Sequence, residues 1–184
     1  MADVAVVAHS RKSLGGGLPE LRQLLARAGV TNPSWYEVKK SRRAPRYARK
    51  AAADGAGVVF VWGGDGTVQR CIDALARTDT AVAILPAGTA NLLASNLSIP
   101  RDLPEAVQIG LHGDRRRLDT GSVNGERFAV MAGAGCGRGS KSTGRSSSPA
   151  RSRACWPRTS ARSSAGSRHS RRRNRTTGAL SSGW

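Results

Sequence analysis

The first 113 residues alternate between short apolar runs and segments in which apolar residues recur at helical spacing. Runs typical of buried parallel strands occupy 4–8, 58–62 and 81–85, and a further strand candidate lies at 35–38. Helices are expected between and after them, at 18–28, 42–55, 68–75, 91–97 and 102–113. This alternation predicts an α/β fold, in which helices cover both faces of a parallel sheet.

The pattern changes after residue 113. Two segments, Leu118–Val123 and Arg127–Met131, flank Asn124-Gly125, a pair that favours the tight turn of a β-hairpin. We therefore expect a first domain over 1–137, with the beginning of a β-rich domain at about 115–137.

Residues 138–184 differ in kind from the rest of the chain. They contain 12 Lys and Arg and no acidic residue, and Leu180 is their only Leu, Ile, Val or Phe. Such a segment has too little apolar surface to offset the entropy of ordering it, so we expect a disordered, low-complexity basic tail. This tail also supplies most of the formal net charge of +18, since the first 137 residues hold 18 basic and 12 acidic side chains.

Composition argues against several classes of protein. Cys71, Cys136 and Cys155 form no close pair, which indicates neither a disulfide scaffold nor a zinc site, and no residue is assigned as a metal ligand. The apolar run at 4–8 is too short for a signal peptide or a membrane span. We therefore expect a cytoplasmic location.

The sequence Gly63-Gly64-Asp65-Gly66-Thr67 joins a predicted strand to a predicted helix. Glycines allow backbone N–H groups to approach phosphate oxygens closely, and the positive end of the helix dipole would face the anion. Thr67 can add a hydroxyl donor. Asp65 would repel a bare phosphate, which suggests a metal ion or an attacking hydroxyl nearby. The alternative is a tight turn in which Asp65 only caps the helix.

A second loop, Pro86-Ala87-Gly88-Thr89-Ala90-Asn91, follows the next predicted strand. The carboxyl ends of neighbouring parallel strands meet at one edge of a sheet, where open α/β folds bind ligands. Two such loops together favour a phosphate site over the alternative of an ordinary connection between strand and helix.

These two loops and Leu118-Asp119-Thr120-Gly121, in this order, resemble the diacylglycerol kinase catalytic-domain family over about residues 3–135. That family includes bacterial diacylglycerol kinases and sphingosine kinases, and it shares the first loop with NAD kinases. The resemblance implies a Rossmann-like nucleotide-binding domain, a β-rich lipid-binding domain, and transfer of the γ-phosphoryl group of ATP to a lipid hydroxyl with Mg²⁺. Diacylglycerol and sphingosine are the acceptors that it suggests.

Roles for individual residues also follow from the resemblance. It implies that the nucleotide phosphates are held by Gly63, Gly64, Gly66 and Thr67, with help from Gly88, Thr89 and Asn91. It places Asp65 at the reacting centre, near the acceptor hydroxyl or the metal, and gives Asp119 a supporting role in the metal-linked network. These are the two catalytic residues that we predict.

The chain also departs from the family pattern. Residues 9–17 replace the usual Asn-Pro-x-Ser-Gly, and Leu92 follows Asn91 where the family commonly has an acid. The family continues far past this point, but nothing in 138–184 resembles that continuation. A frameshift near residue 136 would explain the abrupt change and would leave the fragment inactive on lipid. A family-like continuation in another reading frame of the gene would establish the frameshift.

Other interpretations remain open. The chain can be a soluble NAD kinase-like phosphotransferase, or its basic tail can bind nucleic acid without specificity and in a salt-dependent way. A basic face at Arg42, Arg46, Arg49 and Lys50 can contact the inner face of an anionic membrane, although a solvated surface is the simpler interpretation. A homodimer is also possible.

Overall fold

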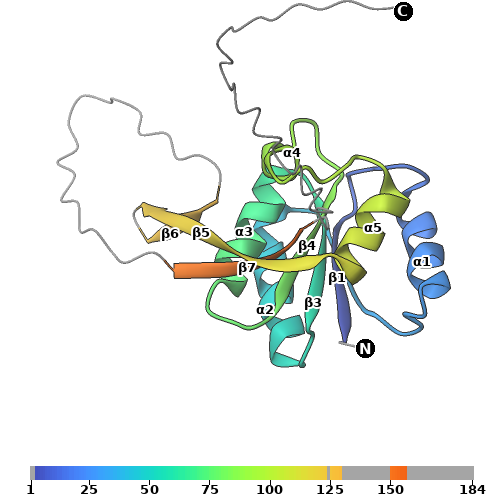
Figure 1. Cartoon of the computed structure of the whole chain (residues 1–184), viewed down its shortest axis with the longest axis horizontal. Coiled ribbons are helices and arrows are strands. Elements are labelled where there is room, and N and C mark those ends of the chain that lie inside the picture. The colour runs from blue at the N-terminus through green and yellow to red at the C-terminus, as the bar shows by residue number, and fades with distance from the viewer. Residues whose placement is uncertain (1–2, 124, 130–149, 157–184) are drawn as a thin grey trace, which may run out of the picture.

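The centre of the fold is a sheet of four parallel strands in the order β2-β1-β3-β4 (Figure 1). Their bounds are Val4–His9 for β1, Ser34–Val38 for β2, Val58–Gly63 for β3 and Ala81–Pro86 for β4. The computed structural model describes residues 3–123, 125–129 and 150–156. Every residue of β1, β3 and β4 is buried, which explains their continuous apolar sequences. The predicted α/β fold with a parallel sheet is confirmed.

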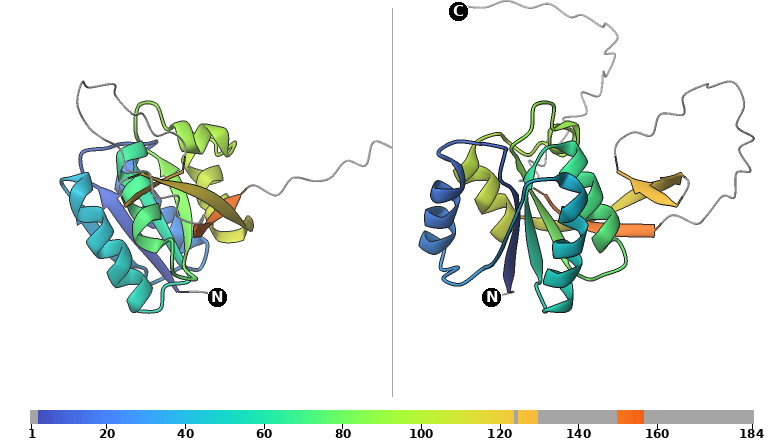
Figure 2. Two further views of the ribbon diagram at one scale, coloured as in Figure 1. Left: turned by 90° about the vertical axis from the view of Figure 1, so that its left-hand side faces the viewer. Right: turned by 180° about the vertical axis from the view of Figure 1, so that it is seen from behind.

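Helices cover both faces of this sheet (Figure 2). On one face lie α1 (Gly17–Arg27) and α5 (Leu103–His112), and on the other lie α2 (Ala44–Ala53) and α3 (Asp65–Leu75). A short 3-10 turn, η1 (Ser41–Arg43), leads into α2, and a short helix, α4 (Leu92–Asn96), follows β4. Each crossover between parallel strands therefore packs apolar side chains on the sheet, as the helical spacing predicted.

Close packing between α5 and the sheet depends on one glycine. A Cβ on Gly110 would lie 2.3 Å from the ring of Phe60 and 2.9 Å from the Cβ of Ala83, so the absent side chain lets the helix approach β3 and β4. At the other end of α5, the carboxylate of Asp102 accepts a hydrogen bond from the N–H of Glu105 (2.9 Å). This bond is an N-cap, and it satisfies a backbone donor that the helix itself leaves free.

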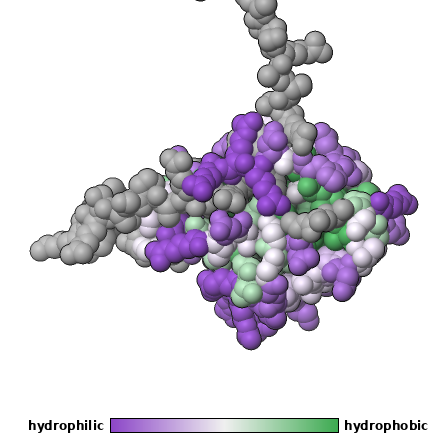
Figure 3. All heavy atoms as spheres, turned by 60° about the horizontal axis from the view of Figure 1, so that its bottom comes forward, coloured by the Kyte–Doolittle hydropathy of each residue, from purple (hydrophilic) through white to green (hydrophobic). Residues whose placement is uncertain are grey.

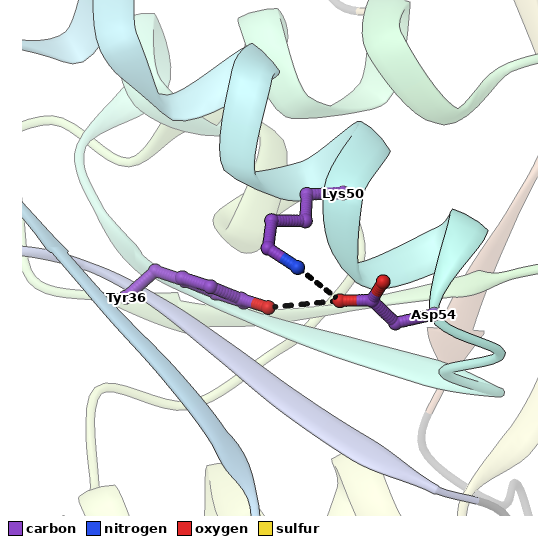
Figure 4. Close-up of polar contacts among 3 residues, drawn as sticks. All are labelled: Tyr36, Lys50 and Asp54. Carbon is purple, nitrogen blue, oxygen red and sulfur yellow. Dashed lines mark hydrogen bonds and ion pairs between the residues drawn. The ribbon is translucent and has the colours of Figure 1, made fainter.

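Edge strand β2 is joined to α2 by polar contacts at the surface (Figure 4). The hydroxyl of Tyr36 donates to Asp54 (3.3 Å), and the ammonium group of Lys50 contacts the same carboxylate oxygen (2.7 Å). The Tyr36 ring also stacks on Tyr47, with 5.2 Å between ring centroids. The hydrogen bond from Lys50 lowers the pKa of Asp54, and the same bond raises the pKa of Lys50. Both charges are solvated, so the ion pair adds little to stability, and the polar contact with β2 is the one made by Tyr36.

An antiparallel extension follows the parallel sheet. Strands β5 (Asp114–Val123) and β6 (Glu126–Phe128) form the predicted hairpin, in which Val123 pairs with Glu126. Gly125 lies between them with φ of +83°, a conformation that favours glycine. The hairpin prediction is therefore confirmed for these residues, whereas 130 and 131, also expected in it, lie outside the described residues.

One segment of the tail is ordered into this extension, contrary to the expectation that it would have no fold. Strand β7 (Ala150–Trp156) lies between β4 and β5, parallel to the former and antiparallel to the latter. The physical reason is that strand pairing uses backbone N–H and C=O groups, which a polar or basic residue carries as well as an apolar one. The expected disorder of 138–149 and 157–184 lies outside the described residues, and the domain boundary at 137 stays a prediction.

Helix α3 holds the hairpin through two side chains one turn apart. The amide of Gln69 donates to the carbonyl of Arg127 and accepts from the N–H of Ala129 (3.1 Å). The carboxylate of Asp73 accepts from the N–H of Arg127 (3.3 Å) and lies 3.6 Å from its guanidinium. The helix that begins at the first glycine loop is therefore also the helix on which β6 docks.

Large apolar side chains are mostly inside. Of the described residues, Leu92 at 44% exposure is the one exposed large hydrophobic side chain. The face viewed in Figure 3 is largely hydrophilic, with a smaller apolar area. Within the described segments, no helix has the length and apolar character needed to cross a membrane.

Candidate functional site

The carboxyl ends of β1, β3 and β4 lie at one edge of the sheet, and both predicted loops are found there. The chain passes from β1 outward to β2 and then returns to β3 on the other side of β1, so the strand order reverses between β1 and β3. Open α/β sheets bind ligands in the crevice at such a reversal. Here the indole N–H of Trp62 donates to the carbonyl of Lys12 (2.9 Å), which fixes the loop that follows β1.

The first loop is a tight turn between β3 and α3. The carbonyl of Gly64 accepts from the N–H groups of Thr67 (2.9 Å) and Val68 (3.1 Å). A Cβ on Gly63 would lie only 2.7 Å from the Cβ of Thr67, so the turn has no room for a larger residue. The buried Thr67 hydroxyl donates to the hydroxyl of Ser41 (3.0 Å). Thr67 thus braces the loop against η1, and its expected contact with phosphate stays a prediction.

The second loop is held in shape by Asn91. This buried residue has a left-handed conformation (φ 51°), and its amide group spans the loop. The NH₂ group donates to the carbonyls of Pro86 (3.0 Å) and Gly88 (2.8 Å), while the amide oxygen accepts from the N–H of Gly88 (2.9 Å). Because both ends of the amide are engaged, the geometry gives Asn91 a part in shaping the loop rather than a free group for phosphate.

The two loops touch through their backbones. A Cβ on Gly88 would lie 2.4 Å from the Cα of Gly64, a separation at which no side chain fits. The carboxylate of Asp65 reinforces this contact by accepting from the N–H of Leu93 (3.3 Å) at the start of α4. The structure therefore brings the predicted residues 63–67 and 88–91 together as one surface.

Basic side chains lie in neighbouring segments at the same edge of the sheet. The loops after β1 and β2 and the 3-10 turn η1 carry six exposed cations: Arg11, Lys12, Lys39, Lys40, Arg42 and Arg43. Asp65 is the only acidic residue in these segments and the two glycine loops. The resulting positive potential favours a polyanionic ligand and raises its rate of encounter with the edge.

Asp119 lies in another part of the sheet. It pairs with Arg151 of β7, three residues before Ala154, which is the residue opposite Val82 of β4. Because β7 runs parallel to β4, this register places Asp119 on the side of the amino end of β4, away from the glycine loops. Its expected role beside Asp65 therefore stays a prediction.

The residues at this edge fit a nucleotide with its magnesium ion. The absence of side chains at Gly64 and Gly88 lets the two loops meet backbone to backbone, and glycine allows a backbone to approach phosphate closely. Mg²⁺ binds through one or two carboxylates together with waters and substrate phosphates, so the half-exposed Asp65 would be enough as its protein ligand. Among the described residues, no three His, Cys, Asp or Glu side chains gather as a metal centre of their own.

Three residues at this edge were not singled out by the sequence. The hydroxyl of Ser41 accepts a hydrogen bond from the hydroxyl of Thr67, and the guanidinium of Arg101 donates to carbonyls of the second loop. His9 is buried at the end of β1, where its Nδ1 accepts from the N–H of Arg11 (3.3 Å). The position of His9, directly after a predicted strand, could have indicated that it lies at this edge of the sheet. Nothing local marks Arg101, because it approaches the loop only through the path of the chain between α4 and α5.

Fold and site together define an α/β domain with paired glycine loops at the carboxyl edge of its sheet. The chain belongs to the diacylglycerol kinase catalytic domain family, since the model of that family matches residues 8–123. Membership of this family implies a phosphotransferase by descent.

Curated relatives carry the same description over part of their length. The chain is 36% identical over 96 residues to a probable YegS-like lipid kinase of Chromohalobacter salexigens. The aligned segment covers 50% of this chain and 31% of that protein. It is 36% identical over 91 residues to a diacylglycerol kinase of Bacillus subtilis, and this alignment covers 48% of this chain and 30% of that protein. The matched segment thus spans about a third of these relatives.

The fold has a counterpart among solved structures. A putative diacylglycerol kinase from Bacillus anthracis superposes with a TM-score of 0.60 at 24% identity, covering 69% of this chain and 45% of that one. At this identity the likeness concerns the fold alone.

Proposed function

We propose that this chain is the nucleotide-binding part of an ATP-dependent lipid kinase, which positions the γ-phosphoryl group of ATP for transfer to a lipid hydroxyl. The observation that carries the proposal is the backbone contact between Gly64 and Gly88, which joins two glycine loops into one surface. Family membership makes ATP the expected nucleotide.

Phosphate binding would use backbone donors from both loops. The first N–H groups of the 11-residue helix α3 have no acceptors within the helix, and its dipole favours negative charge at this end. The exposed segment Thr89–Ala90 offers further N–H groups. The six cations in the segments after β1 and β2 would offset part of the phosphate charge as the nucleotide binds.

Transfer needs an acceptor oxygen in line with the γ-phosphorus. The new bond joins that oxygen to the phosphorus, while the bond from phosphorus to the β,γ-bridging oxygen breaks and ADP leaves. Asp65, as the carboxylate between the loops, is our candidate to receive the hydroxyl proton or to hold the metal. Bound Mg²⁺ would supply charge neutralisation on the phosphate oxygens.

The lipid-binding part of the reaction is expected beyond the segment matched to the relatives. Diacylglycerol and sphingosine are the acceptors proposed, and the exposed basic face of α2 is proposed to meet an anionic membrane. Because the matched segment spans about a third of its relatives, nucleotide binding and phosphoryl transfer require separate tests.

Binding is tested first, by titrating the purified chain with Mg-ATP in a calorimeter. Saturable heat is expected for the wild type, and its absence with well-folded protein would remove the basis of the proposal. The charge-neutral variant Asp65→Asn is expected to alter the magnesium dependence of binding. Asp54→Asn, the same change at the opposite edge of the sheet, serves as the matched control.

Transfer is then tested with γ-labelled ATP and three acceptors, namely diacylglycerol, sphingosine and NAD. Label in a lipid supports the proposed reaction. Label in NAD instead would assign the chain to soluble NAD kinase-like phosphotransferases. Binding of Mg-ATP without transfer to any acceptor would confine the function of this chain to nucleotide binding.

A further inference from the structure

Arg101 approaches the second loop from outside. It lies between α4 and α5, and its guanidinium donates to the carbonyl of Gly88 (3.0 Å) and to the carbonyl of Thr89 (3.3 Å). The carbonyl of Gly88 also accepts from Asn91. One planar guanidinium therefore holds two consecutive peptide groups, which is the arrangement that the rigid fork of arginine suits.

These two bonds fix the direction of the donors on the other side of the loop. In a trans peptide the C=O and N–H groups point in opposite directions, so carbonyls held toward Arg101 turn the N–H groups of Thr89 and Ala90 away from it. Both residues are exposed, and within the described structure neither N–H has a protein acceptor. Two neighbouring donors are left available to a ligand.

The charge of Arg101 is not neutralised by an ion pair in the described part of the chain. Its neighbour Asp102 uses a carboxylate oxygen to cap α5. A full positive charge on the carbonyl side of a peptide polarises it, and this strengthens the N–H group as a donor. Arg101 thus acts on the ligand side of the loop through the peptide groups themselves.

We propose that Arg101 is a positioning residue, which orients and polarises the Thr89 and Ala90 N–H groups for a phosphate of the ligand. The inference rests on the proposed binding of a polyphosphate by these loops. It predicts an effect on the phosphate portion of a nucleotide and none on the base or sugar.

The test compares the full-length chain with Arg101→Gln, Arg101→Lys and the control Arg77→Gln, which removes an exposed charge from the connection between α3 and β4. We expect Arg101→Gln to weaken Mg-ATP binding about tenfold, the order that lost charge-assisted hydrogen bonds produce. Affinity for adenosine should stay within about twofold, Arg101→Lys should recover part of the loss, and Arg77→Gln should bind as the wild type does.

Amide resonances of Thr89 and Ala90 separate this inference from the proposed function. In the wild type they should shift on addition of inorganic pyrophosphate and of Mg-ATP, and in Arg101→Gln they should shift less. A response to pyrophosphate alone would refute nucleotide binding but support the role of Arg101. Unchanged Mg-ATP affinity in Arg101→Gln, an equal loss for adenosine, or no response of these amides to either anion would overturn the inference.

Discussion

Substituting Gly88 by alanine tests whether the two glycine loops act as one surface. The added Cβ would lie 2.4 Å from the Cα of Gly64 and 2.6 Å from the Oδ1 of Asn91. Gly88 does not have a positive φ, so alanine introduces a steric clash without a strained backbone. The substitution therefore probes the contact between the loops together with the hydrogen bond by which Asn91 shapes the second loop.

The size of the effect follows from these distances. Carbon atoms pack at about 3.5–4.0 Å, so the loops must separate by about 1 Å to accept the methyl group. Neither obstacle can move easily, because one is backbone and the other is a side chain held by three hydrogen bonds. Overpacking of this kind costs about 1–3 kcal/mol of stability, and the misplaced donors should reduce Mg-ATP affinity at least about tenfold.

Gly110→Ala is the matched control. It adds the same methyl group against an equally close neighbour, the ring of Phe60 at 2.3 Å, but within α5 against the middle of the sheet. Urea unfolding should show a loss of stability in both variants, whereas calorimetry should show a loss of Mg-ATP affinity only for Gly88→Ala. Wild-type affinity in a folded Gly88→Ala protein, or an equal loss in Gly110→Ala, would refute the reasoning.

Three further predictions concern the scaffold. Burial raises the pKa of the Cys71 thiol to about 12. The unfolded chain therefore loses this proton at lower pH than the folded protein, so stability should fall as pH rises above about 9. By about pH 10.5 the loss measured by urea unfolding should be about 2 kcal/mol larger than in Cys71→Ala. A parallel pH dependence in the two proteins would contradict this. Gln69→Ala removes the hydrogen bonds of this side chain to Arg127 and Ala129 and should cost about 1–2 kcal/mol, with faster amide exchange in the hairpin. Unchanged exchange there would show that Gln69 does not hold the hairpin on α3. Lys50→Ala breaks an exposed ion pair and should leave the urea midpoint unchanged, so a clear shift would mean that the pair stabilises the fold.

Much of the fold could be predicted because the local signals agree with the tertiary structure. Apolar runs predicted the bounds of β1, β3 and β4 to within one residue, because strands buried on both faces contain few polar residues. The helix expected at 102–113 is observed as α5, and Asn124-Gly125 correctly indicated the hairpin. Strand β7 could not be predicted, because its pairing depends on two sheet edges that become available only when the rest of the chain is folded.

The sequence by itself determined the parallel α/β fold, the family and the two glycine loops, because glycine content and strand burial are constraints on local residue types. Only the tertiary structure decided how these loops meet. It showed that the backbones of Gly64 and Gly88 are in contact. It also showed that the amide of Asn91 is hydrogen-bonded within its own loop, and that Arg101 donates to the same loop from outside. Such relations depend on where separate segments of the chain meet in space, which no pattern along a single segment records.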